Sequence, residues 1–205
     1  MSSIHRGPRG AAALLSALLA LAGCDGGALP GLVDLDGRAA NPLSHGDAAA
    51  TVALFVDSDC PVSNRYAPEV RRLHRSFAAR GVRFWLVYPD PDLGAEDIRA
   101  HLDAYGYEMP ALRDPEHALV ARARAQVTPE AAVFLPDGSL AYHGRIDDRY
   151  VAIGRQRAPT RHDLEEVLEA VLAGRDPESG FEPPAGRALA FASRPGIGCF
   201  IEDLR

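Results

Sequence analysis

The cysteine at position 60 carries the clearest chemical signal in this sequence. An apolar run of strand length, Thr51 to Val56, leads into residues 57–63 (DSDCPVS), and a helical pattern begins just beyond the cysteine. A thiol at a helix N-terminus lies near unpaired backbone N–H groups and the positive end of the helix dipole, and both favour the thiolate. We therefore predict that Cys60 is a nucleophile.

Two aspartates, Asp57 and Asp59, flank this sulfur. Their negative charge opposes thiolate formation, whereas the helix terminus favours it. Aspartate at a strand-to-helix turn commonly caps the backbone of the loop. We favour capping for both residues, and the alternative is that they bind a cation or a proton.

Cys199 is the second cysteine with a candidate role, and it lies in a stretch rich in proline and glycine near the C-terminus. Two interpretations stay open. In the first, the tail from Glu182 to Arg205 folds back over the Cys60 face, and Cys199 is a disulfide partner or shares a metal with Cys60. A disulfide requires Cα atoms within about 7 Å. In the second, Cys199 is a small buried hydrophobic residue that anchors the tail.

The elements that must position these sulfurs alternate between strand and helix. Val70, Leu73 and Phe77 give the first helix one apolar face. Asp137-Gly138 marks a hairpin between the last two strands, and Thr160 is the predicted N-cap of the last helix. The predicted strands are 51–56, 82–88, 131–135 and 140–146. The first predicted helix starts just after Cys60, and the others cover 98–105, 116–125 and 161–173.

Several residues, in their order and spacing, make the chain resemble thioredoxin-fold proteins over about 32–173. Among these it is most similar to the redoxin group of alkyl hydroperoxide reductase and thiol-specific antioxidant proteins (AhpC/TSA). The matching residues are 60–63 (CPVS) where strand meets helix, Pro68 within that helix, and Thr128-Pro129 before the strand that faces the site.

The resemblance implies an α/β, thioredoxin-like fold with a central mixed sheet, flanking helices and a C-terminal tail. It also implies that Pro129 is cis and lies beside the reactive sulfur, next to Thr128. The missing N–H of that proline leaves a free backbone edge for a substrate peptide or thiol.

The chain departs from the families it resembles at three positions. Thioredoxins have a second cysteine three residues after the first, and Ser63 stands there, so the motif is CxxS. Peroxiredoxins have a proline and a threonine or serine where this chain has Ala53 and Asp57. A dithiol cycle confined to the CxxS motif is excluded, because one thiol closes no disulfide.

A charged stretch, residues 143–150, follows the last predicted strand. Alternating charges after a strand usually form a solvated loop held by ion pairs. The alternative is that Arg145 or Arg149 reaches the Cys60 face and stabilises a thiolate or a bound anion. Tyr66, one turn into the first helix, is a further candidate for lining that face.

Residues 1–23 have the pattern of a signal peptide, with basic residues followed by an apolar core that is too short to span a bilayer. Residues 21–24 (LAGC) resemble a bacterial lipobox, which implies cleavage before Cys24 and a lipid on that cysteine. The resemblance implies a protein anchored to a bacterial membrane and facing the periplasm. Asp25 favours the inner membrane.

The sequence divides into the signal peptide at 1–23, a glycine-rich tether at 24–31, a thioredoxin-like domain at 32–175 and a tail at 176–205. With 205 residues, 47% of them hydrophobic, the chain suffices for one domain with a full core. Its 22 basic residues, all of them arginine, and 28 acidic residues leave a net charge of −6. This acidic balance argues against a nucleic-acid partner.

Two functions from different classes follow. In the first, the protein is a membrane-tethered thiol oxidoreductase that needs no cofactor. Cys60 attacks a disulfide or a peroxide, and Cys199 or an external protein or small-molecule thiol resolves the product. In the second, it is a copper-binding or copper-delivery protein in which Cys60, with Cys199 or His143, holds the metal, since soft sulfur ligands suit Cu(I). We rank thiol chemistry first.

Overall fold

The computed structural model describes residues 29–44, 47–177 and 192–201. The predicted signal peptide, Cys24 and the predicted tether up to residue 28 lie outside the described residues. Within the described part of the chain, no helix combines the length and the apolar character that crossing a membrane requires.

Strands and helices alternate along the described chain, as the sequence predicts. The helices are α1 (Pro61–Ala78), α2 (Ala95–Tyr105), α3 (Ala118–Ala123) and α4 (Asp163–Leu172). The strands are β1 (Val33–Asp34), β2 (Ala50–Phe55), β3 (Val82–Tyr88), β4 (Ala111–Arg113), β5 (Val127–Thr128), β6 (Glu130–Phe134), β7 (Leu140–Gly144), β8 (Tyr150–Ala152), β9 (Arg155–Gln156), β10 (Ala192–Arg194) and β11 (Cys199–Phe200).

Seven of these strands form one mixed sheet in the order β1-β4-β3-β2-β6-β7-β10. The neighbours β2 and β3 are parallel, as are β3 and β4, whereas β6 is antiparallel to both β2 and β7. The hairpin that Asp137-Gly138 predicts therefore joins β6 to β7. The predicted α/β fold with a central mixed sheet and flanking helices is confirmed.

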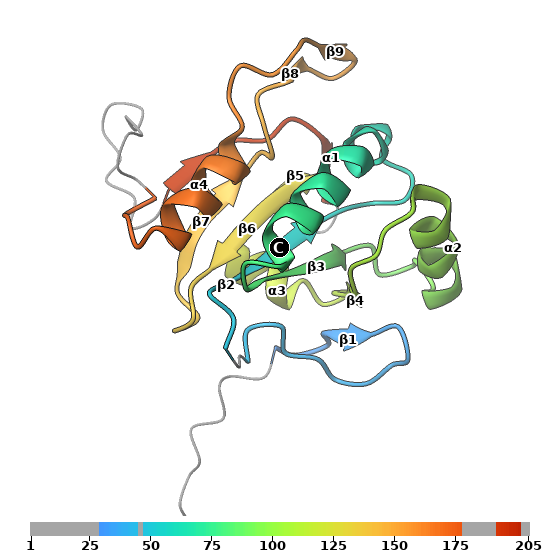
Figure 1. The fold of residues 1–205 in the computed structure, drawn as a ribbon. Coiled ribbons are helices and arrows are strands. Elements are labelled where there is room, and N and C mark those ends of the chain that lie inside the picture. The colour runs from blue at the N-terminus through green and yellow to red at the C-terminus, as the bar shows by residue number, and fades with distance from the viewer. Residues whose placement is uncertain (1–28, 45–46, 178–191, 202–205) are drawn as a thin grey trace, which may run out of the picture.

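Helices cover both faces of the sheet and enclose two hydrophobic cores. Figure 1 shows α1 and α4 in front of the sheet and α3 behind it. Val70, Leu73 and Phe77, the predicted buried face of α1, lie in the front core. The rear core packs Leu119 of α3 against Phe55 of β2. Strand β2 serves both cores, because successive strand residues point to opposite faces of a sheet.

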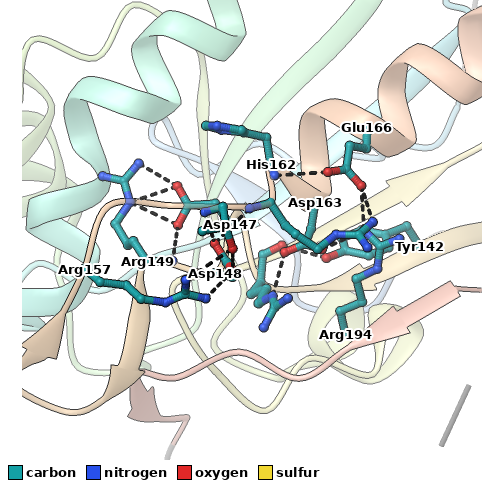
Figure 2. A network of polar contacts seen from close by, with 12 residues as sticks. Tyr142, Asp147, Asp148, Arg149, Arg157, His162, Asp163, Glu166 and Arg194 are labelled. Atoms are coloured by element: carbon teal, nitrogen blue, oxygen red, sulfur yellow. Dashed lines mark hydrogen bonds and ion pairs between the residues drawn. The ribbon is translucent and has the colours of Figure 1, made fainter. Parts of the chain in front are cut away.

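The tail returns to the domain as strand β10, which adds to β7 in parallel at the sheet edge. Gly144 makes this approach possible, because a Cβ there would lie 2.0 Å from the carbonyl oxygen of Arg194. The guanidinium of Arg194 donates at 2.7 Å to Asp163 of α4 (Figure 2), whose other oxygen accepts from Arg145 Nε at 2.6 Å. We call these three residues the Asp163 cluster. Asp163 is fully buried, so the cluster ties the tail to the domain.

The predicted N-cap of the last helix is wrong. Helix α4 begins at Asp163 with His162 as its N-cap residue, not after Thr160. The hydroxyl of Thr160 instead donates to the Asp148 carboxylate at 2.6 Å, and the backbone N–H groups of Thr160 and Arg161 donate to the same carboxylate. These bonds to a buried aspartate hold the chain in a non-helical turn before the helix starts.

The first described residues also differ from the predicted tether. Leu29 packs against the rear core, and its carbonyl oxygen accepts from the Leu32 N–H at 3.3 Å. The chain is therefore anchored from residue 29, because an apolar side chain inside the glycine-rich stretch finds a place in the core.

Candidate active site

Cys60 is the N-cap residue of α1, at the end of the loop that follows strand β2. Pro61 is the first residue of the helix, a position whose N–H has no partner within the helix, so the proline costs no hydrogen bond. The cysteine is 1% exposed, and its thiol donates to the carbonyl oxygen of Thr128 at 3.2 Å. The bond between Thr128 and Pro129 is cis, as the resemblance implies. The structure therefore brings Cys60, Thr128 and Pro129 together.

Cys199 lies against the same sulfur. Its strand β11 is antiparallel to β5, and Cys199 stands opposite Thr128 in the register. Cys60 donates to the carbonyl oxygen of that same threonine, Cys199 packs against the core cluster that contains Cys60, and both cysteines are free. The backbone edge beside Pro129, which the resemblance predicts to be free for a substrate, is thus occupied by the protein's own tail.

The two thiols differ in acidity. Burial by itself raises the pKa of Cys60, but hydrogen bonds from the Cys199 thiol and from the Ser63 backbone outweigh it and lower that pKa below its ordinary value. Burial, the hydrogen bond with Cys60 and the charge of Asp57 raise the pKa of Cys199 to about 12. Cys60 is therefore the more acidic thiol of the two, and Cys199 is the one that stays protonated.

We expect Cys60 to ionise at lower pH in the folded protein than in the same protein unfolded in urea. Ultraviolet absorbance of the thiolate measures this ionisation, and its absence from a Cys60→Ser variant assigns it. The variant Cys199→Ala removes the hydrogen-bond donor and should move the pKa of Cys60 upward. An unchanged titration in Cys199→Ala would show that Cys199 does not stabilise the thiolate.

Gly198 lets β11 approach the site, because a Cβ at this position would lie 2.0 Å from the Thr128 carbonyl oxygen. We expect Gly198→Ala to displace β11 and to slow formation of a Cys60–Cys199 disulfide by at least about tenfold. Quenched oxidation followed by peptide mapping measures this rate. The control is Gly138→Ala, which adds the same methyl group where nothing lies within 4 Å; its positive φ of 78° adds backbone strain in the turn between β6 and β7, outside the pair of cysteines. Equal rates in the two variants would contradict this role of Gly198.

The loop before Cys60 is held by its own polar side chains. Asp57 Oδ1 accepts from the Asp59 backbone N–H at 2.8 Å, which is the predicted capping role. Ser63 is buried, and its hydroxyl oxygen accepts from the Asp57 N–H at 3.4 Å, so the serine of the CxxS motif supports the loop. The side chain of Asp59 is exposed, and within the described residues no hydrogen bond caps the loop through it.

A chain of hydrogen bonds behind this loop was missed by the sequence analysis. The Tyr88 hydroxyl lies 2.7 Å from His101 Nδ1, His101 Nε2 lies 2.8 Å from Asn64 Oδ1, and Asn64 Nδ2 donates to the Ser58 carbonyl oxygen at 2.7 Å. Burial lowers the pKa of His101, which favours the neutral ring. The available signal was the position of His101 three residues after Ile98, on the buried face of α2.

The arginines that were candidates for the Cys60 face are engaged elsewhere. Arg145 binds Asp163. Arg149 binds Asp147 through two nitrogens (Figure 2). Tyr66 is buried, its hydroxyl donates to Asp147 Oδ1 at 2.7 Å, and the Arg149 guanidinium lies 4.5 Å from its ring centroid. Ion pairs hold the loop after β7, as one interpretation predicted, but the loop is not solvated: Asp147 and Asp148 are buried, and none of residues 143–150 is exposed.

His143 does not lie with the cysteines. It stands opposite Ala132 in the register of β6 and β7, and its Nδ1 lies 3.4 Å from Glu130 Oε1. Ala132 belongs to the rear core and Cys60 to the front core. The predicted copper set therefore loses His143, because the sheet separates its side chain from the two sulfurs.

The group of metal-ligating side chains that does converge, within the described residues, is Glu69, His162 and Glu165. Its two carboxylates each form an ion pair with Arg72, at 2.8 Å and 2.5 Å. A cation would have to displace that guanidinium, so the arginine already supplies the positive charge that this cluster attracts.

An open cavity of about 480 Å³ leads to Cys199. Cys199 and Phe200 of β11 line it together with Thr128, whereas Cys60 does not reach its surface. Four aspartates complete much of the wall: Asp57, Asp59, Asp90 and Asp92. Cys199 is therefore more accessible to solvent than Cys60.

This geometry defines a class, the thioredoxin-fold proteins in which a buried cysteine at a helix start lies beside a cis-proline. The chain belongs to the AhpC/TSA family, which matches residues 33–143. Membership assigns it, in general terms, to the thiol-based redox proteins, whose substrates are thiols and disulfides or peroxides.

Solved structures share this fold. An uncharacterized conserved protein from Geobacillus kaustophilus and a hypothetical protein from Sinorhizobium meliloti 1021 are each 25% identical over 83% of this chain. The matches cover 86% and 88% of those chains, with TM-scores of 0.67 and 0.66. A candidate thioredoxin from Neisseria meningitidis is 18% identical over 73% of this chain and 91% of its own, with a TM-score of 0.52. No curated protein matches.

Proposed function

We propose that this protein is a thiol oxidoreductase in which Cys60 and Cys199 form a reversible disulfide. The observation that carries the proposal is that both cysteines lie at Thr128: β11 places Cys199 opposite it in the register, and the Cys60 thiol donates to its carbonyl oxygen. A thiol of lowered pKa next to a protonated thiol is what intramolecular disulfide formation requires, because one sulfur attacks the substrate and the other resolves the product.

Cys60 is 1% exposed and does not line the cavity, so β11 first has to move away from it. In the oxidising half of the cycle, the Cys60 thiolate then attacks one sulfur of a disulfide or one oxygen of a peroxide. A thiolate, hydroxide or alkoxide leaves and takes a proton. Cys199 then loses its proton, its sulfur bonds to that of Cys60, and the group left on Cys60 departs as a thiol or as water. The two cysteines lose two electrons, which the substrate gains. The substrate also gains two protons, one from Cys199 and one from solvent, where the ionisation of Cys60 had released it.

In the reducing half, an external thiolate attacks Cys199. This sulfur lines the open cavity, and Cys60 is the better leaving group because its pKa is lower. The new bond joins the external sulfur to Cys199, the bond between the cysteines breaks, and Cys60 departs as a thiolate. A second external thiol then releases Cys199 and leaves as the external disulfide.

Treatment of the purified, reduced protein with one equivalent of hydrogen peroxide or of cystamine tests this proposal. We expect peptide mapping without reductant to recover a Cys60–Cys199 link, with loss of both thiols. The faster oxidant identifies the substrate class, and Cys199→Ser is the control that forms no link. Recovery of both thiols after treatment with each of the two oxidants would overturn the proposal.

A second candidate function is the binding or delivery of copper by the two sulfurs. The position of both cysteines at Thr128 favours copper binding, since thiolates are soft ligands that select Cu(I). His143 lies on the other face of the sheet and does not contribute a ligand. Anaerobic loading with Cu(I), dialysis and metal analysis compare the two candidates. Stoichiometric copper that is lost in Cys60→Ser would support this candidate, and a disulfide-forming protein without retained copper would refute it.

We propose further that the protein is exported and tethered to a membrane by a lipid on Cys24, facing the periplasm, with the inner membrane favoured by Asp25. The supporting observation is the sequence pattern of residues 1–24. Metabolic labelling with palmitate should mark the protein, and the label should be absent from Cys24→Ser. Equal labelling of both forms would contradict lipid attachment at this residue.

A further inference from the structure

The cavity that exposes Cys199 carries an unbalanced negative charge. Asp57, Asp59, Asp90 and Asp92 line it, and no arginine or histidine does. The four come from the loops after β2 and β3, which are parallel neighbours, so the fold gathers their charges at one end of the sheet. Within the described residues, none of these carboxylates takes part in an ion pair.

The hydrogen bonds of these carboxylates orient them and leave their charge in place. Asp57 Oδ1 accepts from the Asp59 backbone, and Asp90 Oδ1 accepts from the Asp92 backbone at 2.8 Å. The negative field extends to the reacting sulfur, because the charge of Asp57 contributes to the raised pKa of Cys199. A cleft lined by charges of one sign focuses their field on whatever enters.

We propose that this cavity selects, by charge, the thiols that open the Cys60–Cys199 disulfide, and that it takes neutral or cationic thiols in preference to anionic ones. The inference rests on the proposed function, since it concerns the sulfur at which that disulfide is opened. The four carboxylates repel the carboxylate of an anionic thiol, whereas they attract the ammonium group of a cationic one. Salt screens such charges, with a Debye length of about 10 Å at 0.1 M.

Three small thiols of similar size test this selection on the oxidised protein: cysteamine, which is cationic, 2-mercaptoethanol, which is neutral, and 3-mercaptopropionate, which is anionic. Each rate of reduction is divided by the rate of the same thiol with bis(2-hydroxyethyl) disulfide, a neutral reference that removes differences in intrinsic reactivity. We expect the normalised rate to fall by at least about tenfold from cysteamine to 3-mercaptopropionate at low salt. Added salt should shrink this ratio.

Paired variants assign the effect to the cavity. The double variant Asp90→Asn/Asp92→Asn keeps the shape of the wall and an oxygen acceptor at position 90 but removes two charges, so the ratio should shrink. The matched control Asp103→Asn/Asp137→Asn removes two exposed carboxylates that do not line the cavity, and it should keep the ratio of the unchanged protein.

The outcomes separate this inference from the function on which it rests. A normalised ratio near one in the unchanged protein, or equal ratios in the two double variants, overturns charge selection while the mapped disulfide still supports the proposed function. If the disulfide forms with neither oxidant, the charge selection and the proposed function are both overturned.

Discussion

Replacement of Cys60 by serine is expected to lower the rate of oxidant reduction at least about a thousandfold, because a serine hydroxyl stays protonated where the thiol supplies a thiolate. Consumption of hydrogen peroxide or cystamine by the reduced protein in a single turnover measures this loss. Cys199→Ser should behave differently. Its Cys60 is still oxidised once, but the product persists as a sulfenic acid or a mixed disulfide that intact mass and dimedone labelling detect.

The matched control is Cys24→Ser, which removes the third thiol of the chain at the predicted lipid site and should keep the single-turnover rate. The assignment of roles would be wrong if Cys60→Ser kept a tenth or more of that rate. It would also be wrong if Cys199→Ser lost the first oxidation step, since that step is assigned to Cys60 alone.

The second large effect is expected at Asp163, a fully buried carboxylate that accepts from Arg194 (Figure 2) and from Arg145. Asp163→Ala leaves Arg194, which is itself buried, without its closest anion. Breaking a buried ion pair in this way costs about 3–5 kcal/mol of the free energy of unfolding. Urea unfolding followed by circular dichroism measures the loss.

The Asp163 cluster should also affect the site, because Arg194 ends the strand that leads to β11. Arg194→Met removes the cation of the tail but leaves Arg145 beside Asp163, so it should cost less stability than Asp163→Ala. Its disulfide formation should nevertheless be slowed. Normal disulfide formation in Arg194→Met would show that the cluster supports the fold without positioning Cys199.

Exposed ion pairs offer a control for the loss of stability. Glu169 pairs with Arg80 on the surface, where solvent weakens the interaction, and Glu169→Ala should have little effect on unfolding. A stability loss in Asp163→Ala no larger than that in Glu169→Ala would remove the basis for the buried-cluster argument.

The elements around Cys60 were predictable because they depend on local pattern. The predicted strand 82–88 matches β3 at both ends, and the three apolar positions of α1 are buried as expected. The period of apolar residues reports burial directly, since each face of a strand or helix has its own spacing. Pro61 and the residues before it likewise mark the start of α1.

The roles of polar side chains were not predictable in the same way. Thr160 had the sequence signature of a helix cap, yet the buried carboxylate of Asp148 holds it outside the helix. Arg145 was a candidate for binding an anion at the Cys60 face but is bound by Asp163, which α4 supplies. A polar residue bonds to whatever the fold brings near it, and that neighbour is usually distant in the chain.

By itself, the sequence determined that a thiol would stand where an apolar strand gives way to a helix, because strand, proline and helix dipole are all local properties. Only the tertiary structure decided that Cys199 would cover that thiol and take up the edge beside Pro129. The placement depends on Gly198 clearing the Thr128 carbonyl and on Arg194 meeting Asp163. Such contacts join segments that no local periodicity relates, so they exist only once the chain has folded.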